Sequence, residues 1–359
     1  MKVREIIMQL SANKGEWSEF YAFLKILSDK ILYSADETLA LIPKSFLKVL
    51  SIIRNENSRE LIYEIMDEQD KIVIKSDMKV IAEIPIFQIG GKLSNILKKI
   101  KDGPASKGAF KISDAKEIMS ELHCNKIRSS SSSKADIWVK IEDPFTRTQP
   151  IRGFSIKSKI GGMSTLLNAS GATNFEFEIV SKRGQNKDKS KIGLNQILTE
   201  EEDLKFVQIP EITFRQNLTL IESHMPEIVA EMLKAYYLGH QSTIQDVTSY
   251  VEKVDPIKMG SHKHFYEYKV QEFLLAVAFG MQPSKTWDGA YETHGGYIIV
   301  KENGELACYH VYDRDKFKKF LFMNTKFETP STTRHKFGKI YERNRKRYIK
   351  LNLQIRFKN

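Results

Sequence analysis

Cysteine is scarce in this sequence, and its scarcity excludes several classes of protein. Only Cys124 and Cys308 occur among 359 residues. Two thiols cannot build a disulfide framework or a cysteine-rich zinc site. The sequence is therefore not that of a disulfide-stapled secreted scaffold, and we expect the protein in the reducing cytoplasm.

Long apolar runs and two common phosphate-binding signatures are also missing. No apolar segment reaches the length of a membrane span, and the residues after Met1 do not follow a signal-peptide pattern. Neither Gly-x-x-x-x-Gly-Lys-Ser/Thr nor Gly-x-Gly-x-x-Gly occurs. These absences argue against an ATP-driven motor and against a dinucleotide-dependent enzyme.

Acidic residues are outnumbered by basic ones, 45 to 56, which gives a formal net charge of +11. Such an excess favours a polyanionic partner, and nucleic acid is the leading candidate because its phosphates release counterions on binding. An anionic membrane surface is the competing interpretation. Hydrophobic residues make up 41% of the chain and charged residues 28%, as expected for a soluble globular protein.

The hydrophobic pattern changes repeatedly between the helical and the extended period. Helices are expected where apolar residues recur every three or four positions, over residues 16–28, 93–100, 114–122, 225–237, 243–254, 265–279 and 313–321, with a short helix within 165–170. Strands are expected over residues 61–66, 71–75, 80–86, 134–141, 152–159, 174–179, 296–301, 306–311 and 351–357. This mixture predicts an α/β (α+β) fold with a mixed sheet flanked by helices.

Two neighbouring strands of this sheet carry the clearest chemistry. Asp136 begins one strand, and Lys157 interrupts the apolar run of the next. Because side chains alternate along a strand, Ser155, Lys157 and Lys159 share one face, which we expect to be the outer face. A carboxylate for a divalent cation beside a lysine for a phosphate suits metal-dependent hydrolysis of a phosphodiester. From these residues alone, an ordinary solvated strand edge is an equally good interpretation.

The spacing resembles the motif of the PD-(D/E)xK nuclease superfamily, in which an acid on one strand is followed by acid-x-Lys on the next. Asp136 matches the first acid and Lys157 matches the lysine, whereas Ser155 stands where the superfamily has an acid. The resemblance implies Mg²⁺ as the cofactor, with Asp136 as a metal ligand. It also implies that a second carboxylate comes from another element, and that Ser155 holds a metal-bound water.

Four glutamates are candidates for that second carboxylate. We prefer Glu19, with Glu16 second, because both flank the apolar stripe of the helix expected over 16–28. Residues three apart lie on neighbouring parts of a helix, so one can reach inward while the other meets solvent. Glu176 and Glu178 are the alternatives. For all four, an ordinary solvated charge is the competing interpretation.

Six segments extend the resemblance over nearly the whole chain, from about Lys14 to Phe357. They are KGEWSE at 14–19, GFSIKS at 153–158, TLLNAS at 165–170, NTK at 324–326, PSTTRH at 330–335 and LNLQIRF at 351–357. Together they resemble the HpaII-type family of type II restriction endonucleases. The resemblance implies Mg²⁺-dependent cleavage of double-stranded DNA at a short palindromic site, with CCGG as the candidate sequence and 5′-phosphate ends. It further implies a homodimer on the palindrome, and a cognate DNA methyltransferase as a genetic rather than a physical partner.

Several polar residues are candidates for DNA contacts. Asn, Gln and Arg read purine edges through pairs of hydrogen bonds, and the strand expected over 351–357 places three of them on one face. The full candidate set is Ser158, Lys159, Asn168, Arg334, His335, Lys336, Asn352, Gln354 and Arg356. A polar solvated edge is the alternative for the closing strand. The serine run at 129–133 is either a linker or, with Lys126, Arg128 and Lys134, a loop that meets phosphates.

The chain order suggests three regions that together form one compact unit. Residues 1–125 form a helical and hairpin region that carries Glu16 and Glu19. Residues 126–200 supply the core strands with Asp136 and Lys157, and residues 201–359 supply supporting helices and a basic DNA-recognition segment.

Three other functions compete with a DNA endonuclease. A non-catalytic or modification-sensing DNA-binding protein would use the same basic face without needing Asp136 and Lys157 together. An RNA-processing nuclease and a scaffold protein are the others. A histidine-metal nuclease is not favoured, because neither His310 nor His335 has a compact set of partners in sequence and no third ligand lies near His262 and His264.

Overall fold

The computed structural model describes residues 10–56, 59–104, 108–128, 135–144, 146–161, 164–181, 198, 202–239, 241–260, 262, 264–291 and 295–358. The expected loops at 129–133 and 182–191 lie outside these ranges. The chain forms two compact units. Unit 1 lies within Met1–Ser164 and Glu292–Lys316, and unit 2 lies within Thr165–Tyr291 and Phe317–Lys358.

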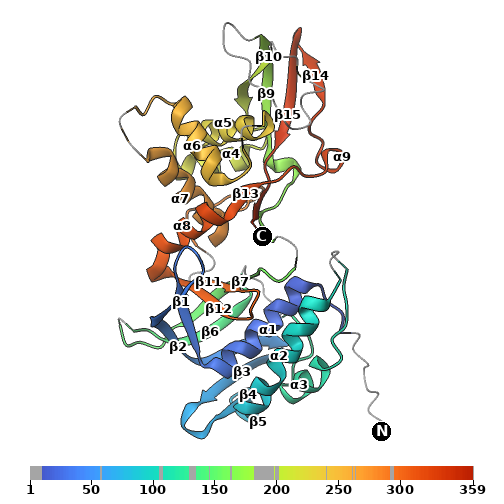
Figure 1. Ribbon diagram of the computed structural model, residues 1–359, viewed down its shortest axis with the longest axis vertical. Coiled ribbons are helices and arrows are strands. Elements are labelled where there is room, and N and C mark those ends of the chain that lie inside the picture. Colours follow the sequence, from blue (N-terminus) through green and yellow to red (C-terminus); the bar gives the residue numbers. More distant parts are fainter. Residues whose placement is uncertain are drawn as a thin grey trace. The chain divides into compact units, whose positions relative to one another are not determined.

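Unit 1 is a mixed sheet covered by helices (Figure 1). Its helices are α1 (Lys14–Asp29), α2 (Ile86–Asp102) and α3 (Ala115–Glu121), with short 3-10 turns at Asp67–Gln69 and Val311–Asp313. Its strands are β1 (Ile31–Ala35), β2 (Leu41–Glu56), β3 (Arg59–Met66), β4 (Lys71–Ser76), β5 (Lys79–Pro85), β6 (Ile137–Glu142), β7 (Ile151–Ser158), β11 (Gly296–Val300) and β12 (Leu306–His310). The helices and strands confirm the mixed α and β composition expected from the sequence.

The nine strands follow the order β1-β12-β11-β7-β6-β2-β3-β4-β5, and β1 also pairs with β2. The long strand β2 makes this possible, because its first part pairs with β1, its middle with β6 and its last part with β3. The pairings therefore close a ring of six strands that contains β6 and β7. The hairpin β11–β12, far along the chain, completes this ring by pairing β11 in parallel with β7.

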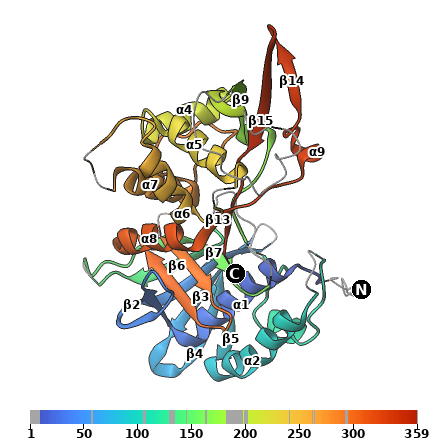
Figure 2. The ribbon, with the colours of Figure 1, turned by 45° about the horizontal axis from the view of Figure 1, so that its top comes forward.

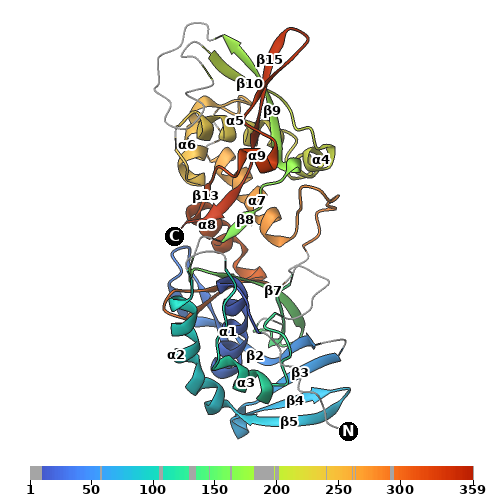
Figure 3. The same cartoon turned by 90° about the vertical axis from the view of Figure 1, so that its right-hand side faces the viewer.

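Helix α1 positions one candidate acid against this sheet. It begins with a capping box, in which Asn13 and Glu16 each accept a hydrogen bond from the other's backbone N–H. The stripe expected from the sequence, including Trp17, Phe20 and Leu24, is buried. Figures 1 and 3 both show α1 beside α2, and the two helices pack on the same core as β6 and β7.

Unit 2 combines four packed helices with two small sheets. Its helices are α4 (Ile212–Ile221), α5 (Met225–Tyr237), α6 (Ile244–Val254), α7 (Phe265–Phe279) and the short α9 (Thr332–His335), and α8 (Arg314–Asn324) begins in unit 1 and continues into unit 2. The first sheet has the order β10-β9-β15-β14, formed by β9 (Asn174–Ser181), β10 (Glu202–Gln208), β14 (Ile340–Arg343) and β15 (Lys346–Asn352). The second has the order β13-β16-β8, formed by β8 (Thr165–Leu167), β13 (Thr325–Phe327) and β16 (Ile355–Phe357). Figure 3 shows β9 and β10 beside β15.

Two expectations for unit 2 were wrong. The short helix expected within 165–170 is instead strand β8, followed by a 3-10 turn at Gly171–Thr173. The single strand expected over 351–357 is broken, because β15 ends at Asn352 and β16 begins at Ile355 in the other sheet. Between them the N–H of Leu353 donates to the carbonyl of Thr173, so the chain crosses from one sheet to the next.

Candidate active site

Asp136 is held in place by the strand beside it. Its backbone N–H donates to the carbonyl of Phe154 at 2.9 Å, which ties it to β7 just before β6 begins. Its Oδ2 atom accepts hydrogen bonds from Ser155 Oγ at 3.0 Å and from the Ile156 N–H at 2.8 Å. The side chain is only 6% exposed. Asp136 is thus a buried carboxylate with a fixed orientation.

A glycine lets the two strands approach at this point. A Cβ atom at Gly153 would lie 2.8 Å from the Cβ atom of Ala135, closer than side chains ordinarily come. Any larger residue at 153 would therefore push on the residue that precedes Asp136.

Ser155 does not lie on an exposed outer face as expected. The residue is 5% exposed, and its strand β7 runs between β6 and β11 within the sheet. Its hydroxyl donates to Asp136 rather than pointing to solvent. The residue that replaces the motif's acid therefore orients the first acid. Its expected contact with a metal-bound water stays a prediction.

Glu19 lies on α1 and comes close enough to Asp136 for the two charges to interact. Burial, and then the negative charge of Asp136, raise the pKa of Glu19 to about 7, while Arg128 and Lys157 oppose the rise. Its Oε2 atom is buried and forms no hydrogen bond with the residues that the structure describes. Two acids whose charges interact at a buried position repel each other, and a cation between them relieves the repulsion.

The other three glutamates are engaged elsewhere. Glu16 Oε2 accepts a hydrogen bond from the Asn13 N–H at 2.9 Å and so caps α1. In unit 2, Glu176 is held by Tyr341, Gln208 and Arg343. Glu178 forms an ion pair with Lys346 at 2.9 Å. Of the four candidates, Glu19 is the one whose charge the structure couples to Asp136.

Arg128 joins the two acids. Its Nη2 atom lies 3.0 Å from Asp136 Oδ1, and its Nε atom lies 3.4 Å from Glu19 Oε2. The arginine side chain itself is 58% exposed. No local sequence pattern predicts this bridge, because only the fold brings residues 19, 128 and 136 together.

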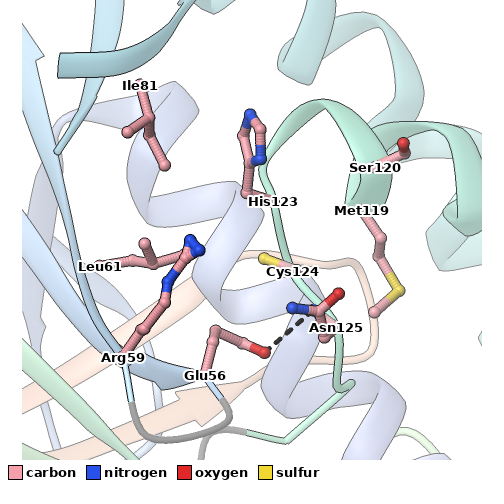
Figure 4. A pocket seen from close by; sticks show the side chains of 9 residues that line it. All are labelled: Glu56, Arg59, Leu61, Ile81, Met119, Ser120, His123, Cys124 and Asn125. Atoms are coloured by element: carbon pink, nitrogen blue, oxygen red, sulfur yellow. Dashed lines mark hydrogen bonds between the residues drawn. The ribbon is translucent and has the colours of Figure 1, made fainter. Parts of the chain in front are cut away.

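The backbone that leads to Arg128 is anchored by a buried ion pair. Arg54 and Glu56 lie 3.0 Å apart with side chains 5% and 2% exposed. Arg54 donates to the carbonyls of Lys126 and Ile127, and Glu56 Oε2 accepts from the Asn125 N–H at 2.9 Å. Figure 4 shows Glu56 and Asn125 at the wall of a cavity of about 490 Å³. The segment is therefore fixed as far as the residue before Arg128.

Lys157 completes the group. It lies on β7 two residues after Ser155, is partly exposed, and contributes positive charge near Glu19. Within the described ranges, no residue forms a hydrogen bond or ion pair with its ammonium. The motif residues Asp136 and Lys157 and the helix residue Glu19 thus share one site in unit 1.

Known proteins match the chain along nearly its whole length. The family described as HpaII restriction endonuclease matches residues 13–357. The type II restriction enzyme HpaII of Haemophilus parainfluenzae is 40% identical over 357 residues, which cover 97% of this chain and 98% of that protein. The chain belongs to the HpaII restriction endonuclease family. The resemblance seen in the sequence is thereby confirmed, and the protein is a site-specific deoxyribonuclease. No solved structure matches the chain.

For a restriction endonuclease, the position of each expected DNA contact matters. In unit 1, Ser158 ends β7 with its hydroxyl accepting from the Ile160 N–H, and Lys159 follows it, partly exposed. In unit 2, the exposed candidates are Asn168, Arg334 and Lys336, with His335 partly exposed. These residues remain candidates for contact with DNA.

The three polar residues of 351–357 do not share an exposed face. Asn352 is 1% exposed, and its amide donates to the Ser170 carbonyl and to Asn174 Oδ1, both at 2.7 Å. This internal bonding explains the correction, because the side chain fixes the turn before β9 and presents nothing to a base. Arg356 forms an ion pair with Glu328 at 2.9 Å. Gln354 lies in the short link from β15 to β16 and is partly exposed.

The sequence predicts a basic segment within residues 201–359, but not the hairpin that this segment forms. Strands β14 and β15 are joined by a turn at Asn344 and Arg345, both with positive φ (52° and 61°). Figure 2 shows this hairpin extending away from the helices of unit 2. Three cations of the hairpin are paired with carboxylates of β9 and β10: Arg343 with Glu176, Lys346 with Glu178, and Arg347 with Glu202. The tip residues Asn344 and Arg345 are exposed.

Histidines contribute no metal centre within the described ranges. No group of three or more His, Cys, Asp or Glu side chains there is arranged to hold a metal ion. His310 is buried against Phe154 and Tyr312, while His262 and His264 are exposed.

Among the helices that the structure describes, none combines the length and the apolar character needed to cross a membrane.

Proposed function

We propose that this endonuclease is a type II restriction enzyme that hydrolyses phosphodiester bonds of double-stranded DNA with Mg²⁺ at a short palindromic site. The observation that carries the proposal is the convergence of Asp136 and Glu19 beside Lys157. Two carboxylates and a lysine are the groups that a member of the PD-(D/E)xK superfamily brings to this reaction. We assign the chain to that superfamily, with the second acid supplied by helix α1.

The donor set fits Mg²⁺. This ion prefers oxygen ligands and needs only one or two carboxylates, because it keeps water and takes substrate phosphate oxygens as well. Asp136 and Glu19 would hold it, and the buried Glu19 Oε2 atom, which lacks a hydrogen bond among the described residues, is a suitable ligand. When bound, Mg²⁺ would neutralise phosphate charge and make a water molecule more acidic.

The protein's own residues would prepare the rest of the reaction. Ser155 and the Ile156 N–H keep Asp136 Oδ2 in one orientation, and Oδ1 is the oxygen that pairs with Arg128. The Lys157 ammonium would bind the scissile phosphate and stabilise the negative charge that develops in the transition state. Glu19 lies on helix α1, so the proposed site has one acid beside the sheet and one on a helix.

Recognition of DNA would come from the basic residues of both units. A two-stranded ribbon fits the major groove, and Arg and Asn are residues that read guanine and adenine edges. We therefore propose the tip of the β14–β15 hairpin, Asn344 and Arg345, as a base-contacting element. Arg334, His335 and Lys336 would contact phosphates.

A palindromic target would favour a homodimer, since each active site then meets one strand. We propose CCGG as the target and 5′-phosphates as the ends. The host would need a cognate DNA methyltransferase to protect its own sites, as a genetic rather than a physical partner.

Digestion of a DNA of known sequence tests the proposal. The purified chain should produce discrete fragments with Mg²⁺ and none with EDTA, and sequencing of the ends should give a single short palindrome. Lys157→Ala should remove cleavage but keep DNA binding, whereas Lys140→Ala, on the neighbouring strand β6, should behave as the unmutated protein does. Cleavage that survives Lys157→Ala would place the active site elsewhere. Preferential cleavage of RNA would identify a different substrate.

A further inference from the structure

We propose that Arg128 holds the cation position between Asp136 and Glu19 when no metal is bound, and that Mg²⁺ must displace its guanidinium to enter. This inference rests on the metal site of the proposed function. It adds that a residue of the chain itself competes with Mg²⁺ for the two carboxylates, and it predicts that this competition weakens metal binding.

The contacts of Arg128 are those of a substitute cation. One guanidinium reaches both acids, with Nη2 at 3.0 Å from Asp136 Oδ1 and Nε at 3.4 Å from Glu19 Oε2. Two like charges that share a buried site repel each other unless a cation lies between them. Lys157 also contributes positive charge near Glu19, but among the residues that the structure describes Arg128 is the one that forms ion pairs with both acids.

The arginine can leave while the acids stay. Its side chain is 58% exposed, so its outward movement requires no opening of the core. The carbonyls of Lys126 and Ile127 are held by Arg54, so the backbone before Arg128 stays in place while the side chain swings. Asp136 keeps its bonds to Ser155 and Ile156 throughout, and it remains oriented for the metal.

Competition for the same oxygens lowers the apparent affinity for metal. A ligand that binds only the open state has its affinity reduced by the fraction of molecules in that state. A guanidinium released from the acids is also a strong partner for phosphate. Phosphates of bound DNA would therefore draw Arg128 outward, and DNA and Mg²⁺ would favour the same arrangement of the site.

Calorimetric titration with Mn²⁺, without DNA, tests the inference without measuring cleavage. Arg128→Gln should bind Mn²⁺ at least threefold more tightly than the unmutated protein and should melt at a lower temperature when metal-free. Arg147→Gln removes the same charge from an exposed arginine 3.9 Å from Glu142, and it should change neither property. Equal or weaker Mn²⁺ binding by a folded Arg128→Gln protein would overturn the inference.

Arg128→Lys distinguishes the effect of bridging the two acids from the effect of positive charge alone. It also tests the inference if Arg128→Gln does not fold. Lysine keeps the charge but presents one nitrogen instead of the guanidinium fork. Bridging predicts that this variant binds Mn²⁺ more tightly than the unmutated protein, with an affinity nearer to that of Arg128→Gln. An affinity equal to that of the unmutated protein would show that charge alone matters and would contradict bridging. If the unmutated protein and every variant bind no Mn²⁺, the metal site of the proposed function fails, and this inference fails with it.

Discussion

Ser155 Oγ donates a hydrogen bond to Asp136 Oδ2 at 3.0 Å, so the residue that stands in place of the motif's second acid orients the first one. A serine at this position keeps one negative charge fewer on the sheet. In the site that we propose, the second charge would come from Glu19 on α1, whose pKa is raised in part by the charge of Asp136. The proposed site would therefore have two acids although the two strands carry only one.

Ser155→Ala should weaken the site without dismantling it. Loss of the hydroxyl leaves Asp136 Oδ2 with the Ile156 N–H as its remaining partner from β7. Residues that orient metal ligands typically matter by about 10- to 100-fold in activity or metal affinity. We expect a single-turnover cleavage rate about tenfold lower and a loss of stability of about 1 kcal/mol. Ser45→Ala, whose hydroxyl contacts Ser34 rather than the site, is the matched control. A variant with an unchanged cleavage rate would show that Asp136 does not depend on Ser155.

Glu19→Gln should stabilise the metal-free protein at alkaline pH. The pKa of Glu19 is raised from 4.5 to about 7 in the folded state, so its ionised form opposes folding. Its contribution is most favourable below pH 4.5 and is lost as pH rises through about 7. A neutral glutamine removes this loss, which amounts to at most about 3 kcal/mol.

Denaturation in EDTA at pH 5 and at pH 8 measures this effect. The free energy of unfolding of the variant should exceed that of the unmutated protein at pH 8 but not at pH 5. Added Mg²⁺ should then stabilise the unmutated protein and not the variant, since a ligand stabilises the state that binds it. If the variant were more stable by the same amount at both pH values, ionisation of Glu19 would not be the cause.

His310 should make the protein sensitive to acid. Burial is the main cause that lowers the pKa of His310 from 6.5 to about 4. A group with a depressed folded pKa stabilises the fold above its unfolded pKa, and this stability is lost as pH falls from 6.5 through about 4. His310→Asn keeps an acceptor for the Tyr312 N–H but cannot titrate. The free-energy difference between the two proteins should shrink by up to about 3 kcal/mol between pH 7 and pH 4. A difference that does not change with pH would contradict a neutral buried imidazole.

Arg345→Ala should weaken DNA binding in a way that reports its partner. If Arg345 reads a base, the loss should be about 1–3 kcal/mol for the specific site and smaller for unrelated DNA. If it contacts only a phosphate, binding should weaken equally on both, with a salt dependence shallower by about one ion. Arg147→Ala removes the same charge from unit 1 and controls for net charge. Unchanged affinity on both DNAs would exclude the hairpin tip from the interface.

Local patterns predicted much of the secondary structure. Helices α5 and α7 match the expected ranges 225–237 and 265–279, because the apolar residues of α5 favour one face and α7 is a long, largely apolar segment without glycine or proline. The hairpins β3–β4 and β11–β12 were equally clear, since polar turns separate their strands. Asp136 and Lys157 stand out in the sequence because one charge directly precedes an apolar strand and the other interrupts the next one.

What depends on distant partners could not be predicted. Strand β8 forms because Leu167 pairs with Ile355, nearly the whole of unit 2 away in sequence. The break after Asn352 is hidden because Leu351, Leu353 and Ile355 are all buried although the chain changes sheets between them. The bridge from Arg128 to the two acids likewise arises from the fold and leaves no local pattern.

The cleavage rate of Glu19→Gln, compared with Glu16→Gln, tests the central claim most directly. Both variants remove one carboxylate from the same turn of α1, and a glutamine at 16 can still cap the helix. At saturating Mg²⁺ and under single-turnover conditions, Glu19→Gln should lose cleavage by at least about 100-fold, as expected when a catalytic metal is no longer held. Glu16→Gln should cleave at nearly the rate of the unmutated protein. Full cleavage by Glu19→Gln, together with loss of cleavage in Glu16→Gln, would show that Glu19 is not the second acid of the site.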